Sequence, residues 1–395
     1  MAEILVSPGV LANENDQSFV TQQPVTLGAA LIGPTVKGPV EDPVIVTTFS
    51  DYSSRFGTTL QSGSGTYTPL TTLAAQNYFA NGGTSLTVAR AVPSASLWTF
   101  ATASVGTYIS HSFNGGAVLT SSVVNPGETG FGSIAYYTAS VTIESLDKGI
   151  EFNNSGSLLA NDALSTGSVD NIRWEVATNN TSSGLFSLVI RRGDDTDVNK
   201  VVLETFPNLS LDETQPNYIS AVIGDQTRNY NATENYIEIS GSHPNNSRYI
   251  RIKTVNRPTY NFLDNAGNAR PQFTQSIPSL RSGSYAGAFA GGIGSNFQNQ
   301  GIAAVGATNY YDAINASNTQ GLVGKDYDNM ISLLANQDDF SFNAIATPGI
   351  YYDDYSSQVT TIINNTQVRG DNLFILDLVA WGSTINNVVT EAGNL

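Results

Sequence analysis

The stretch from residue 25 to residue 49 (VTLGAALIGPTVKGPVEDPVIVTTF) decides the fold class expected for the first part of the chain. Its first nine residues are apolar enough for a buried strand, and residues 43–49 (PVIVTTF) have the β-branched composition of a second strand. Residues 33–43 are rich in Gly and Pro, which favour turns. The stretch therefore predicts two strands joined by a turn.

Helices are expected after these two strands. Ser50 and Asp51 are predicted to cap a short helix that ends at Gly57. Pro69 stands at the first position of a second predicted helix, which stops at the glycine pair 82–83. Strands that alternate with helices in this way indicate α/β structure.

The same alternation continues in residues 86–92 and returns near the end of the chain. Residues 86–92 (LTVARAV) are predicted to form a strand, and residues 327–335 and 356–367 have helical spacing. Residues 342–349 (FNAIATPG) predict a strand and a turn, and residues 372–381 (NLFILDLVAW) predict a strongly buried strand.

The middle of the chain has a different pattern. Residues 95–168 consist of short apolar stretches broken by Gly, Asn and Ser, which is typical of a small antiparallel sandwich or barrel. A meander of strands is predicted from Ile172 onward, a helix over residues 217–225 and a further strand over 249–255. Residues 257–306 are dominated by Gly, Asn, Ser and Pro, and they predict a long surface loop.

Charge and composition exclude several classes of protein. The net charge is −16, from 33 acidic and 17 basic residues, which argues against a protein that binds the nucleic-acid backbone. Without any Cys, disulfides, thiolate metal sites and thiol nucleophiles are excluded. The start of the chain has no basic region before an apolar stretch, and no apolar run reaches about 20 residues. We expect neither export nor membrane insertion.

No catalytic, cofactor-binding or metal site is predicted. The two histidines, His111 and His243, lie in no recognisable motif. The Gly-rich residues 283–297 are not followed by the Lys-Ser or Lys-Thr pair of a phosphate-binding loop. We therefore expect that the chain is not an enzyme and needs no cofactor.

Clustered carboxylates suggest two further possibilities. Asp194, Asp195 and Asp197 have the spacing of a calcium-loop fragment, but the later Gly and Glu of such a loop are missing, so a solvated hairpin turn is favoured. The adjacent acids at 338–339 and 353–354 could be paired as in a glycosidase. We favour turns and helix N-termini for these pairs, because adjacent acids are common there.

Several stretches resemble the contractile tail sheath proteins of tailed phages. Their order along the chain is specific, and together they touch most of it. The stretches are SPGV at 7–10, GAALIGPTVKGPVEDPVIVTTFSDYSSRFG at 28–57, YFANGGTSLTVARAV at 78–92, VVLETFPNLSLDETQPNYISAVIGDQ at 201–226, ATPGI at 346–350 and RGDNLFILDL at 369–378.

The resemblance implies an α+β multidomain fold whose α/β domain is discontinuous. Residues 25–92 plus 336–395 are expected to form the α/β domain, which would be incomplete at its C-terminal end. An inserted antiparallel β-barrel or sandwich is expected over 93–168, and a second mixed β-rich domain over 169–335. An extended arm is expected over residues 1–24.

The function that the resemblance implies is structural. Copies of the chain would form rings or helical strands around the tail tube protein, between the baseplate and the tail terminator proteins, and would contract. The location would be the virion, after assembly in the host cytoplasm. The arm would join a neighbour's sheet through Ile4, Val6, Pro8 and Val10. A frayed terminus remains the alternative for this segment.

One feature of the chain departs from the family pattern. Family members continue well past the equivalent of Asp377, so this chain would be a fragment or would be completed by another polypeptide. A bacteriocin sheath or another contractile injection system has the same pattern. The abundant Asn, Thr, Gly and Tyr also fit a β-rich surface adhesin or carbohydrate-binding structural protein. A polysaccharide-degrading enzyme is a third possibility.

Overall fold

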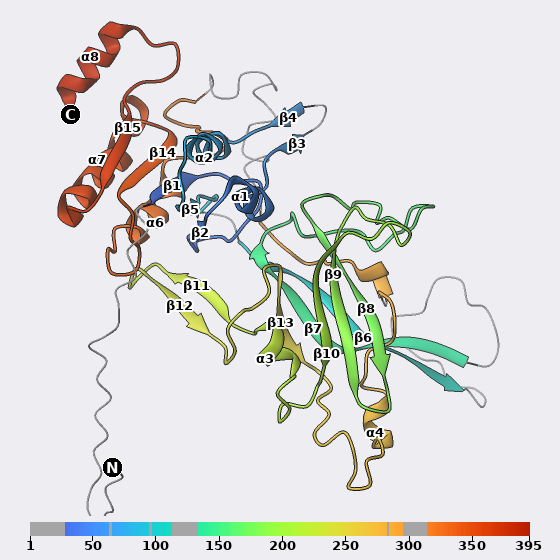
Figure 1. Cartoon of the computed structure of the whole chain (residues 1–395). Coiled ribbons are helices and arrows are strands. Elements are labelled where there is room, and N and C mark those ends of the chain that lie inside the picture. The colour runs from blue at the N-terminus through green and yellow to red at the C-terminus, as the bar shows by residue number, and fades with distance from the viewer. Residues whose placement is uncertain (1–27, 63–64, 95–96, 113–132, 283, 295–313) are drawn as a thin grey trace, which may run out of the picture.

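The structure is a computed structural model that describes residues 28–62, 65–94, 97–112, 133–282, 284–294 and 314–395 (Figure 1). The predicted arm, with Ile4, Val6, Pro8 and Val10, lies outside these residues. The described part of the chain contains helices, one mixed sheet and several antiparallel sheets, so the α+β class is confirmed.

A five-stranded sheet combines strands from both ends of the chain (Figure 1). Its central strand β1 runs parallel to β5 and β14, and β2 pairs with β5 in the antiparallel direction at one edge. The strand order is β15 (Leu373–Asp377), β14 (Ala344–Tyr351), β1 (Ala29–Gly33), β5 (Leu86–Arg90) and β2 (Val44–Val46). We call this sheet and its helices, over residues 28–94 and 314–395, the sheet unit.

Helices cover both faces of the five-stranded sheet. Helices α1 (Phe49–Phe56) and α2 (Leu70–Ala80) bury Tyr52, Phe56 and Ala75 against β1 and β5 on one face. On the other face, α6 (Lys325–Leu333) and α7 (Tyr352–Arg369) pack on a larger apolar core. A short hairpin of β3 (Leu60–Ser62) and β4 (Gly65–Tyr67) and the final helix α8 (Ile385–Asn394) complete the unit.

The start of α1 differs by two residues from the prediction. Thr48, rather than Ser50 or Asp51, is the N-cap, because its side chain accepts a hydrogen bond of 3.0 Å from the backbone N–H of Asp51. The helix ends as expected at Gly57, whose φ of 71° favours glycine. The predicted span of this helix is otherwise confirmed.

The middle of the chain forms a sandwich of two three-stranded antiparallel sheets (Figure 1). One sheet has the order β13 (Ile250–Val255), β7 (Ser133–Lys148) and β6 (Phe100–Ser112). The other has the order β10 (Val202–Leu209), β9 (Leu185–Arg192) and β8 (Ile172–Asn180). With the short helices α3 (Ile219–Ile223), α4 (Pro271–Thr274) and η1 (Ser284–Gly287) and the hairpin of β11 (Thr227–Asn231) and β12 (Tyr236–Ser240), these sheets form the sandwich unit.

The two sheets of the sandwich unit share one apolar core. Val105 and Ile143 from the first sheet pack in the same cluster as Trp174 and Leu188 from the second. Residues from both predicted middle domains therefore contribute to one core. The boundary between those domains, at residues 168 and 169, stays a prediction.

The described part of the long loop predicted over residues 257–306 has little regular structure, as expected, but its predicted surface location is wrong. Ile277 and Phe289 are buried in the sandwich core, and Ala290 forms a backbone bridge with Thr102 of β6. Isolated apolar residues among Gly and Ser give no periodic pattern. The burial of Ile277 and Phe289 could therefore not be predicted from the sequence.

The strand predicted near the C-terminal end is confirmed as β15, but its strong burial is wrong. β15 is an edge strand that pairs only with β14 in the described part of the chain. Phe374 and Leu376 pack on the core under α7, whereas Leu373 is 67% exposed and Ile375 is 58% exposed. An unbroken apolar run predicts burial on both faces, but on this face α1 and α2 pack against β2, β5, β1 and β14, and Leu373 and Ile375 of β15 stay exposed.

Candidate functional site

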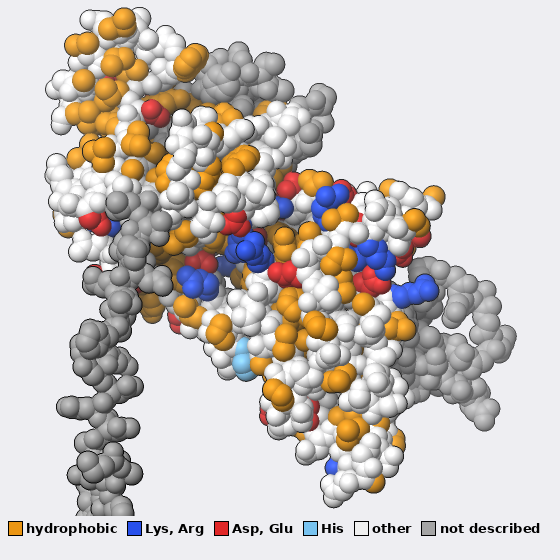
Figure 2. All heavy atoms as spheres, in the orientation of Figure 1, with side chains coloured by type: hydrophobic (Ala, Val, Ile, Leu, Met, Phe, Trp, Pro, Cys, Tyr) orange, Lys and Arg blue, Asp and Glu red, His pale blue; other side chains and the backbone are white. Residues whose placement is uncertain are grey.

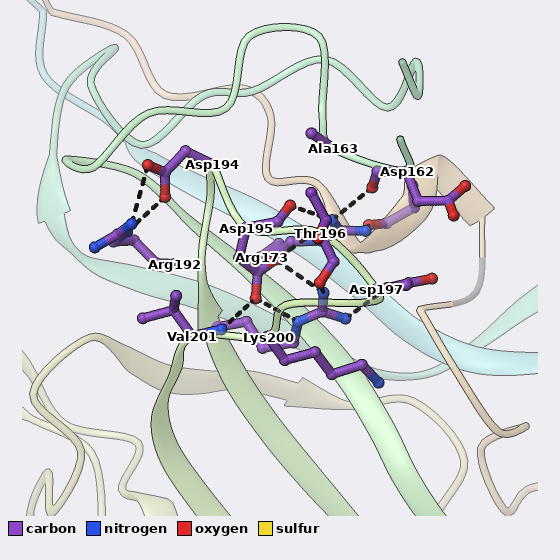
Figure 3. A network of polar contacts seen from close by, with 12 residues as sticks. Asp162, Ala163, Arg173, Arg192, Asp194, Asp195, Thr196, Asp197, Lys200 and Val201 are labelled. Atoms are coloured by element: carbon purple, nitrogen blue, oxygen red, sulfur yellow. Dashed lines mark hydrogen bonds and ion pairs between the residues drawn. The ribbon is translucent and has the colours of Figure 1, made fainter. Parts of the chain in front are cut away.

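The acidic loop between β9 and β10 is built around a buried ion pair (Figure 3). Arg191 donates from Nε to Asp195 Oδ2 and from Nη2 to Asp195 Oδ1, at 2.8 Å each, and both side chains are fully buried. This two-point contact is the strongest geometry that an arginine and a carboxylate can adopt. The loop is therefore a fixed part of the sandwich unit.

Further charges surround this pair. Arg191 Nη1 lies 2.7 Å from Glu175 and 2.9 Å from Asp197, and Arg173 Nη1 lies 3.5 Å from Asp195. Burial alone would lower the pKa of Arg191, but its hydrogen bonds to Asp195 and Asp197 outweigh burial and raise it. Burial and the neighbouring Arg191 lower the pKa of Arg173. The positive charges that face the carboxylates of the loop thus come from Arg173 on β8 and Arg191 on β9.

The calcium-loop interpretation therefore finds no support in this geometry. Asp195 binds two arginines, Asp197 binds Arg191, and Asp194 pairs with Arg192 at 2.5 Å. The loop joins two antiparallel strands, as the hairpin prediction required. Its solvated character was wrong, because Asp195 is buried. The carboxylates were visible in the sequence, but their partner Arg173 lies 22 residues away from Asp195.

His243 is held by an acid in a surface turn. Its Nδ1 lies 2.9 Å from Asp225 Oδ2, and Asp225 Oδ1 accepts hydrogen bonds from the backbone N–H groups of Ser242 and His243. Partial burial opposes the effect of these contacts, yet they hold the pKa of Asp225 below its usual value. His111 lies in β6 opposite Ile134. The structure thus places His243 beside Asp225, and their contacts stabilise the turn.

The paired acids occupy the places that were favoured from the sequence. Asp353 and Asp354 lie in the first turn of α7, and burial followed by the neighbouring Asp353 raises the pKa of Asp354. Asp338 donates its backbone N–H to Asn336 in the turn after α6, and Asp339 accepts from the same Asn336. The turn and helix N-terminus interpretations are confirmed.

An uncovered apolar surface lies at the C-terminal end of the sheet unit. Figure 2 shows hydrophobic side chains gathered over the region where Figure 1 places β15, α7 and α8. The helix α8 has no buried residue, and its two ends are held by the N-cap Thr384 and by a 2.9 Å contact from Tyr352 Oη to the Asn394 carbonyl. We define the C-terminal apolar surface as the exposed Leu373, Ile375, Trp381, Ile385, Val388 and Val389.

Two clefts separate the sheet unit from the sandwich unit. The larger has a volume of about 820 Å³ and the smaller about 490 Å³. Arg55 and Arg248 line both clefts, together with the edge-strand residues Val44 and Ile45. Figure 2 shows basic and acidic side chains gathered along this junction.

The described residues provide neither a metal site nor a membrane-spanning helix. No group of three His, Cys, Asp or Glu side chains there could hold a metal ion. No helix among those residues is long and apolar enough to cross a bilayer.

Comparisons with known proteins give structural neighbours alone. No family model and no curated protein sequence matches the chain. A sheath tail protein from Listeria innocua aligns with 12% identity over 88% of this chain and 46% of its own length, with a TM-score of 0.38. A sheath tail protein from Desulfitobacterium hafniense aligns with 10% identity over 92% of this chain and 51% of its own length, with a TM-score of 0.33. The chain spans about half the length of these neighbours.

Proposed function

We propose that the chain is a structural subunit of a contractile phage tail sheath. One observation carries the proposal: four of the stretches that resemble sheath proteins lie far apart in the sequence but come together in one sheet, while residues 201–226 provide β10 and α3 of the sandwich unit. Residues 28–57 and 78–92 provide β1, β2 and β5, and residues 346–350 and 369–378 provide parts of β14 and β15. This convergence supports a shared fold behind the resemblance, because unrelated fragments have no reason to become neighbours.

The C-terminal apolar surface supports a role in assembly. Its exposed side chains form a patch on a sheet edge and an adjacent helix, and large exposed apolar patches are typical of protein contact sites. The patch contains no basic residue, and Asp377 and Glu391 are the acids on its two elements. The six side chains that define the C-terminal apolar surface are themselves uncharged, so an apolar contact, rather than a charge pair, would join two copies there.

The remaining parts of the proposal concern partners and motion. Copies of the chain polymerise helically around the tail tube, between the baseplate and the terminator, in the tail of the virion. The arm of each subunit, through Ile4, Val6, Pro8 and Val10, adds as an extended strand to a sheet of its neighbour. Contraction is a rigid-body rearrangement of the packed subunits, which drives the tube through the host envelope.

Electron microscopy of negatively stained protein tests this function. The purified chain is imaged over a range of protein and salt concentrations, alone and with a candidate tube protein. Rings or tubes of uniform diameter are the expected result. If only dispersed particles appear with the tube protein present, and a longer chain that extends past Leu395 forms no tubes either, the sheath proposal is wrong.

A further inference from the structure

The junction between the two units contains charge pairs beside its clefts, whereas the cores inside the units are apolar. Each unit buries its own cluster of aliphatic and aromatic side chains. Four charge pairs cross the junction and border the two clefts. These pairs are Lys37–Asp170 at 3.1 Å, Arg228–Asp42 at 2.8 Å, Arg248–Asp51 at 3.4 Å and Arg55–Asp147 at 4.0 Å.

The pair between Arg55 and Asp147 is unusual because it is only half formed. Arg55 extends from α1 and Asp147 lies near the end of β7, so the pair joins the two units. Their closest atoms, Nη2 and Oδ1, are 4.0 Å apart, which is too long for a hydrogen bond. Arg55 is held instead by a hydrogen bond of 3.1 Å from its Nη1 to the carbonyl of Arg248.

Both members of this pair leave buried polar atoms unsatisfied. Among the described residues, Arg55 Nε has no acceptor and Asp147 Oδ1 has no donor, although both atoms are inaccessible to solvent. A buried polar atom without a partner costs free energy, which is recovered when the partner arrives. A closer approach of Arg55 would give Asp147 Oδ1 the donor that it lacks.

The environment of Asp147 adds to this cost. Its side chain is nearly buried, at 4% exposure of the residue. Burial raises the pKa of Asp147, against the opposing effects of Arg55, Arg90 and Lys37. Burial likewise lowers the pKa of Arg90 to about 10, although Asp147 and Glu151 oppose this change. Ionisable side chains in a cleft whose pKa values are shifted by burial are often found at functional sites.

A pivot for such a motion lies at a different part of the junction. The hairpin of β11 and β12 belongs to the sandwich unit, but its Tyr230 and Ile237 pack on the core of the sheet unit. Asn235 at its turn donates a hydrogen bond of 2.8 Å to the carbonyl of Ser332 on α6. This mixed contact anchors the units at one place, while the clefts leave room for movement at another.

We propose that Arg55 and Asp147 form a latch that sets the orientation of the sheet unit relative to the sandwich unit. Closure of the larger cleft shortens their separation by about 1 Å, to the usual length of a charge-assisted hydrogen bond. The open and closed arrangements are two states of one hinge that pivots on the β11–β12 hairpin. This inference concerns a single chain and does not depend on the proposed sheath function.

A distance measurement between the two units tests the latch. The chain has no Cys, so Val198→Cys in the sandwich unit and Val368→Cys on α7 give two unique labelling sites, which are 94% and 87% exposed. Pulsed electron spin resonance on the doubly spin-labelled full chain then measures the distribution of distances between the units. We expect two populations, one for each state.

Variants of the latch then have defined effects. Asp147→Asn and Arg55→Gln are each expected to change the ratio of the two populations by about tenfold, the effect expected for one charge-assisted hydrogen bond. The exchanged pair, Arg55→Asp with Asp147→Arg, restores part of the original ratio.

Two controls keep this test decisive. Lys200→Gln removes an ion pair to Glu175 that lies wholly within the sandwich unit, and it leaves the distance distribution unchanged. If Arg55→Gln fails to fold, Arg55→Lys replaces it, because lysine keeps the charge but loses the planar donor group. A distance distribution that is the same in the original chain, in Asp147→Asn and in the variant of Arg55 overturns the latch.

Discussion

Arg191 and Asp195 face each other at the end of the β9–β10 hairpin and make two hydrogen bonds of 2.8 Å, with both side chains buried. A buried pair of this kind is costly to break, because removing one charge leaves the other without a partner in a poorly solvated place. Single substitutions in the acidic loop can therefore distinguish a buried carboxylate that stabilises the fold from a solvent-exposed one that does not.

Asp195→Ala is predicted to destabilise the fold by about 3–5 kcal/mol, because it leaves Arg191 buried without its two-point partner. The measurement is the free energy of unfolding in urea at neutral pH. Asp197→Ala is the matched control: it removes another carboxylate that contacts Arg191, but this side chain is half exposed, so a loss of about 1 kcal/mol or less is expected. Equal losses in both variants would contradict this account.

Asp225→Asn is predicted to lose stability in a pH-dependent way. The folded-state pKa of Asp225 lies below its ordinary value of 3.8, so its contribution is fully present above that value and disappears as the pH falls through the lowered pKa. We expect a loss of about 1 kcal/mol at pH 7, since solvent screens this partly exposed site. Urea unfolding at pH 7 and at pH 3 should show the difference shrink; a constant difference would be inconsistent with it.

Asp147→Asn is predicted to have the opposite effect on stability to Asp225→Asn. The pKa of Asp147 is raised by burial above 3.8, so the folded state retains a proton that the unfolded state has already released. The cost of ionising Asp147 is absent below about pH 3.8, grows as the pH rises through the window between the two pKa values, and is complete above it. Thermal unfolding should therefore give the Asn variant an equal or higher melting temperature at pH 7. A clear decrease would contradict the assigned cost of this charge.

Phe289→Ala tests the position of the Gly-rich segment. A buried Phe in the sandwich core is expected to cost about 3–5 kcal/mol when truncated, whereas a surface-loop Phe would cost little. Ile293→Ala, at a half-exposed position four residues later, is the control, with an expected loss of about 0.5 kcal/mol. Urea unfolding compares the two, and losses of similar size would show that the segment is not anchored at Phe289.

The sequence is informative where periodicity and turn chemistry agree. Residues 43–49, with their β-branched composition, contain β2, and the glycine after α1 ends that helix with a positive φ, both as predicted. The first turn of α7 contains Asp353 and Asp354, as expected for acids near a helix N-terminus. These features depend on neighbours in the chain, so a single sequence contains the necessary information.

Features that depend on distant residues could not be predicted in this way. The apolar run in β15 predicts burial, but only the sheet order reveals that Leu373 and Ile375 lie on an uncovered edge. The acids of the β9–β10 loop were identified, but the pairing of Asp195 with Arg173 required the fold. Likewise, Arg55 and Asp147 are separated by 92 positions in the sequence, and no pattern along the chain connects them.

The proposed assembly is tested most directly by sedimentation velocity of the full chain and of two matched variants over a wide range of protein concentration. Ile375→Asp places a charge on the C-terminal apolar surface, and Val198→Asp places one at an isolated exposed position of the sandwich unit. The account predicts that the unmodified chain and Val198→Asp form larger species as concentration rises, whereas Ile375→Asp remains monomeric. A chain that stays monomeric at every concentration, or an Ile375→Asp variant that assembles like the other two, would contradict it.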